Sequence, residues 1–203
     1  MSKYIYGCKK DTPDLRDHLY SAKVDKAVLP AQVDLRAKFS PVVDQGELGS
    51  CTANAIVSGL REYQLLQKGE WKALSRLFLY YEERSLEGTV DSDSGAEISD
   101  GMKVLHQIGV CPERDWPYDI STYMKPPIPQ DLTDASLYKI IDYHRVTSLD
   151  LLKAALAEGL PVVMGIDVYL SFESDSVSST GIIPMPDTTN EKLIGGHAIC
   201  AAG

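Results

Sequence analysis

Apolar residues recur every three or four positions between residues 51 and 66, which is the spacing of one face of an α-helix. The same spacing predicts two further helices, over residues 75–84 and 97–108, and Gly109 suits the end of the last one. A glycine-bearing loop, residues 44–50, leads into the first helix. The first half of the chain is therefore predicted to be mainly helical.

The second half has the shorter apolar period and the residue types of strands. Strands are predicted over residues 138–146, 162–168 and 198–202, with a short helix after the capping-box spacing at residues 147–150. Residues 171–193 are rich in Ser, Thr and Asp and are predicted to form a long surface loop. Helices first and strands later favour an α+β fold with two segregated halves.

Changes in composition divide the chain into three segments. Residues 1–28 form a polar leader without a sustained period, residues 29–128 a mainly helical lobe, and residues 129–203 a β-rich lobe. An extended crossover is predicted at residues 126–129, and a short strand at residues 33–36.

Composition excludes several classes of protein. The 203 residues carry 20 basic and 29 acidic side chains, a net charge of −9, which argues against a nucleic-acid partner. No apolar run approaches the roughly 20 residues of a membrane helix, so we expect no membrane partner. The start of the chain lacks an apolar signal segment. We therefore expect a cytoplasmic or otherwise reducing compartment, with secretion after loss of a signal peptide as the alternative.

Two residues stand out as candidates for chemistry. Cys51 lies where the glycine-bearing loop enters a helix, and the helix dipole there favours a thiolate over the free thiol, whose pKa is about 8.5. His197 follows Gly195–Gly196, and these two glycines leave room for a group to approach its ring. The alternatives are a buried structural cysteine and a core histidine. The other cysteines and histidines lack the short spacings of a metal site, so we expect no metal.

Several segments, in order between residues 29 and 203, resemble those of papain-like (C1 family) cysteine peptidases, especially bacterial-type members with a short leader. They are Leu29–Arg36 at the start of the mature enzymes, Gln45–Ala53 around the cysteine, Ser94–Ala96 with Gly109–Val110 and Trp116–Tyr118 in the substrate wall, and Gly195–Ala198 on the histidine strand. The cysteine and histidine are 146 residues apart, and papain-like enzymes have roughly 130–150; this agreement is part of the resemblance.

The resemblance implies a papain-like two-lobed fold and a peptidase. Cys51 is then the thiolate nucleophile and His197 its imidazolium partner, while Gln45 and the Cys51 backbone N–H form the oxyanion hole. The reaction passes through a thioester acyl-enzyme that water hydrolyses, and it needs no metal or organic cofactor.

The resemblance also implies a substrate-binding set. Gly95 is expected to hydrogen-bond the substrate backbone. The S2 pocket, which takes the second side chain before the scissile bond, would be formed by Ala96, Gly165, Ile166 and Ala198. Gly165 and the two alanines leave room for a bulky apolar side chain. The alternative is that Gly165 and Ile166 belong to the core of a strand.

The sequence departs from the family pattern in places. No asparagine lies among the six residues after His197, where the family places the group that orients the histidine. We therefore expect the β-rich lobe to be incomplete in this sequence and the asparagine to follow Gly203. Leu48 replaces a cysteine of secreted relatives, which fits a reducing compartment, and Thr52 replaces a common tryptophan.

We expect a cysteine endopeptidase that acts on peptides or proteins. The alternatives are an exopeptidase or an acyl or peptidyl transferase on the same fold, and a papain-fold binding protein with impaired catalysis. Residues 4–20 of the leader are hypothesised to fold back over the Cys51 groove as an autoinhibitor, which would make the chain a zymogen. The alternative is a surface arm.

Overall fold

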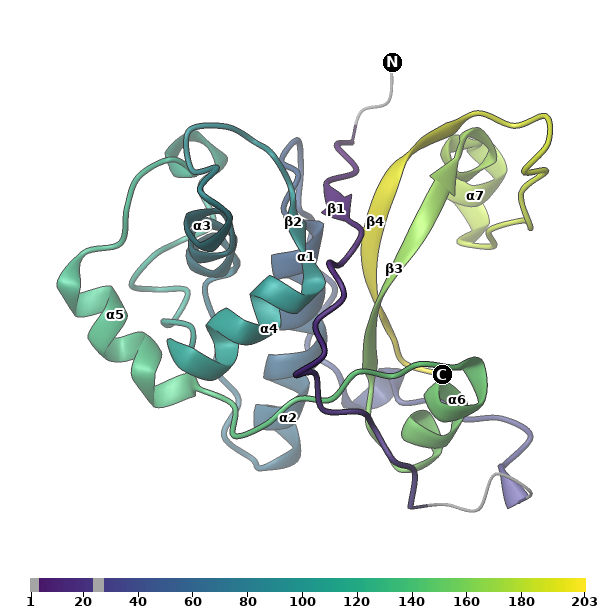
Figure 1. Ribbon diagram of the computed structural model, residues 1–203, viewed down its shortest axis with the longest axis horizontal. Helices are drawn as coiled ribbons and strands as arrows, with labels where there is room; N and C mark the ends of the chain where they lie inside the picture. The colour runs from purple at the N-terminus through teal and green to yellow at the C-terminus, as the bar shows by residue number, and fades with distance from the viewer. Residues whose placement is uncertain (1–3, 24–27) are drawn as a thin grey trace.

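The computed structural model describes residues 4–23 and 28–203. Helices α3, α4 and α5 gather on one side of the molecule, and the strand pair β3–β4 stands on the other with α6 and α7 at its ends (Figure 1). The leader passes between these two lobes. The α+β fold with two segregated halves is confirmed.

The elements up to residue 138 are β1 (Cys8–Lys9), η2 (Arg36–Lys38), α1 (Cys51–Asn54), η3 (Ala55–Arg61), α2 (Glu62–Gln67), α3 (Arg76–Glu87), β2 (Ala96–Glu97), α4 (Ile98–Gln107), η4 (Ile120–Thr122), α5 (Pro129–Ala135) and η5 (Ser136–Tyr138). The elements that follow are α6 (Leu149–Ala157), β3 (Val162–Tyr169), η6 (Leu170–Glu173), α7 (Asp175–Thr180) and β4 (Leu193–Ala201).

The helix predicted over residues 51–66 is a continuous run of α1, η3 and α2, and its middle part, η3, is π-helical. Gly59 in η3 lies against β4, where a Cβ atom would be 2.6 Å from the Cβ of Cys200. The close approach of helix and strand at this point therefore requires glycine. It sets the helix that begins at Cys51 directly against the strand that carries His197.

The other two predicted helices are α3 and α4. The hydroxyl of Ser75 caps α3 by accepting a hydrogen bond from the Phe78 N–H at 3.1 Å. Phe78 and Leu105 are fully buried in the core between these helices. Ala135 and Ile140 belong to the same core, so the packing of the helical lobe continues past residue 128.

Strands β3 and β4 pair in antiparallel register, with Gly165 opposite Ala198 and Ile166 opposite His197. Both strands were predicted, although β4 begins several residues before the predicted start. The two-stranded ladder fixes the histidine on the face of this lobe that meets α1.

Two predicted strands are wrong. Residues 138–146 alternate in polarity, but they make only an isolated bridge, between Leu19 and Arg145. Residues 33–36 form no strand because the Asp34 carboxylate accepts hydrogen bonds from the Arg36 N–H and guanidinium, which favours the turn of η2. The predicted loop over residues 171–193 also contains two short helices, η6 and α7.

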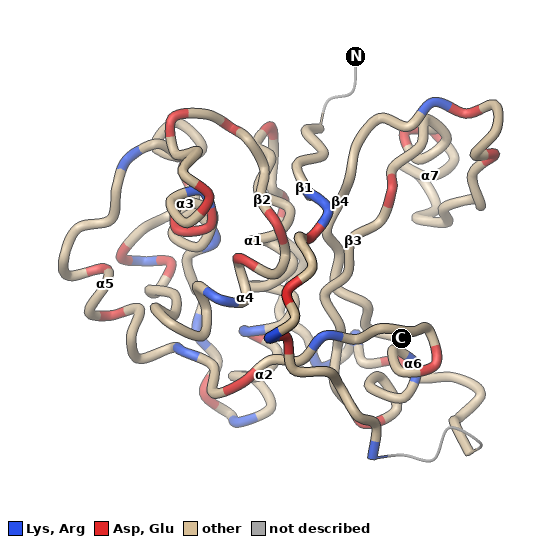
Figure 2. Tube along the Cα trace, in the orientation of Figure 1, with Lys and Arg blue, Asp and Glu red and all other residues tan. Residues whose placement is uncertain are grey.

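Charged residues of both signs are interspersed over the two lobes (Figure 2). Within the described ranges, no helix has the length and apolar character needed to cross a bilayer. The same residues contain no group of three or more potential metal ligands. All four cysteines are free thiols.

Candidate active site

Cys51 is the first residue of α1 and is fully buried. Burial raises the pKa of its thiol, although hydrogen bonds from the backbone N–H groups of Ala198, Gly7 and Thr52 to the sulfur lower it. The expectation of an easily ionised thiol is therefore wrong for this arrangement, because desolvation outweighs the N–H groups at the helix start. One of these three donors, Gly7, belongs to the leader.

His197 lies on β4 and is half-buried. Burial lowers the pKa of its imidazole, so burial favours the neutral form of this ring as it does that of the Cys51 thiol. Aromatic rings cover it from two sides, with ring centroids at 5.6 Å for Tyr6 and 6.2 Å for Phe172. Its Nδ1 atom is buried and has no hydrogen-bond partner among residues 4–23 and 28–203. The described residues therefore leave the orientation of the ring to packing alone.

Gln45 lies on the loop before α1. Its side-chain amide donates to the Leu48 carbonyl at 3.0 Å and to the carbonyl of Ile5 in the leader at 3.3 Å. Gln45 and His197 line one cavity of about 450 Å³, and Cys51 receives a hydrogen bond from the residue after His197. The structure thus brings the three predicted residues together, and leader residues contact all of them.

The leader crosses the groove between the lobes as an extended segment. The Gly7 carbonyl accepts a hydrogen bond from the Ala96 N–H at 3.0 Å. β1 then pairs in parallel with β2, with Cys8 opposite Ala96. On the other side, Gly7 forms a bridge with Gly196 of β4. The leader backbone is therefore bonded to both lobes.

Glycines make this close passage possible. A Cβ atom at Gly95, whose φ is +67°, would be 1.8 Å from the Gly7 oxygen. One at Gly196 would be 2.3 Å from the Cys8 oxygen, and one at Gly7 would be 2.4 Å from the Gly49 oxygen. Any side chain at these positions would push the leader out of the groove.

The predicted hydrogen bond from Gly95 to the substrate backbone stays a prediction. In this structure the Gly95 N–H donates to the Tyr80 hydroxyl at 3.1 Å, although Gly95 itself lies against the leader. The next N–H along the chain, that of Ala96, is the one that binds the leader. The backbone donor on this wall is therefore Ala96.

The side chain of Cys8 occupies the predicted S2 region. Its sulfur would be 3.4 Å from a Cβ atom at Gly165, and it packs on the cluster formed by Cys51, Ala55 and Ala198. Gly165 also lines a larger cavity of about 670 Å³, together with Ile98, Met102 and Met164. Ile166, the next residue of β3, is not among the residues that line this cavity.

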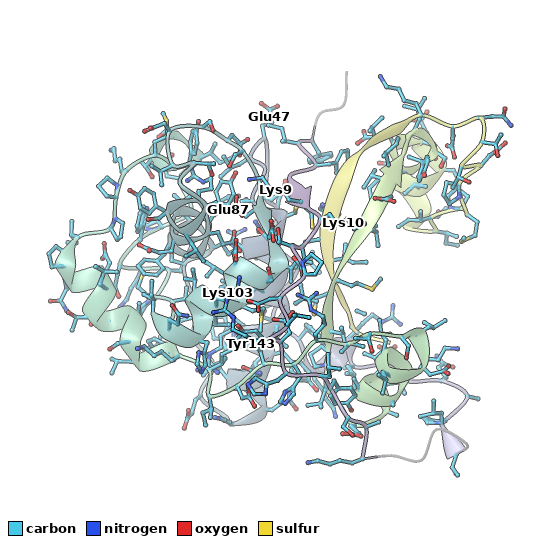
Figure 3. All side chains as sticks on the ribbon, viewed as in Figure 1. Lys9, Lys10, Glu47, Glu87, Lys103 and Tyr143 are labelled. Atoms are coloured by element: carbon cyan, nitrogen blue, oxygen red, sulfur yellow. The ribbon has the colours of Figure 1, made fainter. Side chains whose placement is uncertain are left out.

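Ion pairs outside the groove also attach the leader to the rest of the chain. Arg145 binds the leader carboxylates of Asp11, at 3.0 Å, and Asp17. In the first part of the leader, Lys9 points toward Glu87 of α3 and forms an ion pair with it (Figure 3). Ion pairs thus attach the leader to residues on both sides of residue 128.

Sequence reasoning missed the individual contacts of the leader, which are made by Ile5, Tyr6, Gly7 and Cys8. The available signal was a glycine between apolar residues in an otherwise polar segment. It also missed Phe172, in a segment predicted to be loop, whose ring covers His197.

Comparison with known proteins identifies relatives over almost the whole chain. The family model "Papain family cysteine protease" matches residues 29–203. The crystal structure of xylellain, a cysteine protease from Xylella fastidiosa, is 42% identical with a TM-score of 0.85, covering 97% of this chain and 78% of xylellain. An uncharacterized peptidase C1-like protein of Acanthamoeba polyphaga mimivirus is 38% identical, covering 98% of this chain and 72% of the relative.

A more distant structure is similar in fold alone. Digestive procathepsin L 3 of Tenebrio molitor larval midgut is 24% identical with a TM-score of 0.60, and the match covers 75% of this chain and 48% of that one.

Proposed function

Since the chain belongs to the papain family of cysteine proteases, we propose that it is an endopeptidase acting through Cys51 and His197. The observation that carries this proposal is the extended leader that lies in the groove. The leader is bonded to Ala96 and Gly196, and it continues past Cys51 in both directions. A groove that admits a chain at both ends suits cleavage within a peptide.

The proposed reaction begins with attack of the Cys51 thiolate on the scissile carbonyl carbon. The oxyanion accepts hydrogen bonds from the Gln45 amide and the Cys51 backbone N–H. His197 then donates its proton to the leaving amine, and a thioester remains on Cys51. Water, deprotonated by His197, attacks the thioester and releases the acid product and the free thiol.

The leader is proposed to be an inhibitor that occupies each of these groups. The Ile5 carbonyl accepts a hydrogen bond from the Gln45 side-chain amide. The Gly7 N–H donates to the Cys51 sulfur, and the Tyr6 ring packs against His197. The Gly7 carbonyl is bound to the Ala96 N–H of the helical lobe. The sulfur therefore faces a leader N–H in place of a carbonyl carbon, so the leader does not acylate it.

The substrate is proposed to carry a bulky apolar side chain two residues before the scissile bond. Cys8 is small, and the cavity of about 670 Å³ beside it is lined by Ile98, Met102 and Met164. A larger apolar side chain would fill this space, and its burial would stabilise the bound substrate.

The four free thiols support a reducing compartment as the site of action.

The test compares the full chain with a form lacking residues 1–28, on internally quenched peptides with blocked or free termini. We expect the shortened form to cleave blocked peptides faster, and Cys51→Ser to abolish cleavage. Cleavage restricted to free termini would favour an exopeptidase, and product transfer to an added amine a transferase. Absence of cleavage, with no reaction of Cys51 with an epoxysuccinyl inhibitor, would favour a binding protein.

A further inference from the structure

Glu83 of α3 is a fully buried carboxyl group beneath the helix that begins at Cys51. Its Oε2 atom accepts a hydrogen bond from the Thr52 hydroxyl at 2.7 Å. Its Oε1 atom has no hydrogen-bond partner within the described part of the chain. Because Thr52 directly follows Cys51, this single hydrogen bond connects α3 to the first turn of the helix that carries the nucleophile.

No cation is paired with this carboxyl group among the described residues. Arg84 is also fully buried, but its guanidinium donates to backbone carbonyls, including those of Val90 and Ser92. Glu87 and Asp100 lie near enough to add negative charge. An unpaired buried carboxylate is strongly disfavoured, so burial raises the pKa of Glu83 well above its ordinary value.

The carboxyl group is held by packing as well as by Thr52. Gly101 of α4 lies over Oε1, and a Cβ atom at this position would be 2.3 Å from that oxygen. The same Cβ atom would be 2.5 Å from Ile56 in η3. Three segments, α3, α4 and the helix of Cys51, therefore meet at Glu83 and leave its side chain little freedom.

We propose that Glu83 is a positioning residue for the peptidase reaction. As a neutral carboxylic acid it holds Thr52, and through it the Cys51 backbone, without placing a negative charge beside the thiolate. This inference rests on the proposed function, and it adds a residue that does not touch the substrate. An ionised Glu83 would oppose ionisation of Cys51, since like charges disfavour each other in a medium of low dielectric constant.

The titratable and charged groups facing Glu83 come from three elements and the leader. They are Arg84 and Glu87 of α3, Asp100 of α4, Cys51 of α1, and Cys8 of the leader. Glu87 is paired with Lys9 and Asp100 with Lys103. Of this set, Arg84 is the cation that favours a charged Glu83, and burial outweighs its effect.

The test uses the full chain and the variant Glu83→Gln, which is uncharged and keeps an oxygen for the Thr52 hydroxyl. The Cys51 thiolate is titrated by its ultraviolet absorbance, as the difference from the matching Cys51→Ser protein. We expect the titration midpoints of Glu83→Gln and the wild type to coincide. A midpoint at lower pH in Glu83→Gln would show that Glu83 is charged at the pH where Cys51 ionises and would overturn the proposal.

The positioning role is tested separately with Thr52. We expect Thr52→Val to lower kcat for a blocked peptide about tenfold with little change in KM, since it removes one hydrogen bond to a buried group. Thr52→Ser restores the hydroxyl and should recover most of kcat. Unchanged kcat in a folded Thr52→Val protein, or no recovery in Thr52→Ser, would overturn the proposal.

Glu82→Gln is the matched control, because Glu82 is the neighbouring half-buried carboxyl group with no contact to Thr52. It should leave the thiolate midpoint and kcat unchanged. If neither the wild-type chain nor its form lacking residues 1–28 cleaves any peptide, the proposed function fails. The titration still decides the charge of Glu83, so the two failures are distinguishable.

Discussion

The Gly7 carbonyl oxygen accepts a hydrogen bond from the Ala96 N–H at 3.0 Å, and this bond decides which leader atoms meet Cys51. With the carbonyl turned to the helical lobe, the Gly7 N–H is the group that reaches the sulfur. A peptide bound in this way fills the groove while its carbonyl carbon stays away from the nucleophile.

The first prediction concerns Gly7. In Gly7→Ala the added Cβ atom would be 2.4 Å from the Gly49 backbone oxygen, and neither backbone can yield cheaply. The leader should leave the groove, and the full chain should cleave a blocked peptide about tenfold faster or more. A loss of about 1.4 kcal/mol in the free energy of leader binding corresponds to this tenfold change. Leu15→Ala is the control, because Leu15 is fully exposed. Equal rates in the two variants would contradict inhibition by the leader.

The second prediction concerns Arg145. Replacement by Met removes the ion pairs with Asp11 and Asp17 while keeping much of the side-chain volume. We expect the activity of the full chain to rise about tenfold, since hydrogen bonds to charged groups contribute about 1.5–3 kcal/mol. The leader should also become more sensitive to added trypsin. Arg114→Met, at an exposed ion pair with Asp115, should change neither property.

The third prediction concerns pH. Under the leader, burial raises the pKa of Cys51 and lowers that of His197, so the covered site favours the neutral pair. By linkage, leader binding should weaken as pH rises through the pKa of the uncovered thiol, and as pH falls through that of the uncovered imidazole. Binding of a synthetic peptide of residues 4–20 to the form lacking residues 1–28 should therefore be tightest at intermediate pH. In Cys51→Ser the alkaline decrease should disappear and the acidic one persist.

The fourth prediction concerns the S2 pocket. In Gly165→Val the new side chain would enter the space lined by Ile98 and Met102. For substrates with Leu or Phe at the second position before the scissile bond, we expect kcat/KM to fall about tenfold or more. Substrates with Ala there should lose far less. Ile166→Val is the control, because Ile166 does not line this cavity; an equal loss for both substrates would contradict the assignment.

The fifth prediction concerns stability. Gly101→Ala places a Cβ atom against Glu83 and Ile56 in a packed core and should destabilise the protein by about 1–3 kcal/mol in urea unfolding. Lys153→Ala, at an exposed position of α6, should change stability by no more than about 0.5 kcal/mol. Combining Gly101→Ala with Glu83→Ala should cost less than the sum of the single changes, because the clashing oxygen is gone.

Local signals explain why much of the helical lobe could be predicted from the sequence. The apolar spacing after Cys51 sets the helix start, Ser75 supplies a cap that needs no distant partner, and Gly109 adopts the positive φ of +93° that suits a helix end. The segment over residues 138–146 had the right alternation for a strand. It fails because strand formation also requires a neighbouring strand.

The less predictable parts of the site depend on contacts between distant residues. Nothing in the two residues of β1 indicates pairing with β2, since the partner lies in another part of the chain. Gly95 and Ala96 are adjacent, and only the position of Tyr80 decides which N–H faces the groove. Glu83 looks like any polar helix position until Thr52 and Gly101 enclose it.

The bonds of Gly7 and Cys8 to both walls also have a mechanical consequence. One backbone joins β2 on the helical side to β4 on the other, so the leader cross-links the two lobes. Rotation of one lobe against the other would have to break these bonds first. Departure of the leader would therefore remove a cross-link between the lobes as well as the peptide that fills the groove.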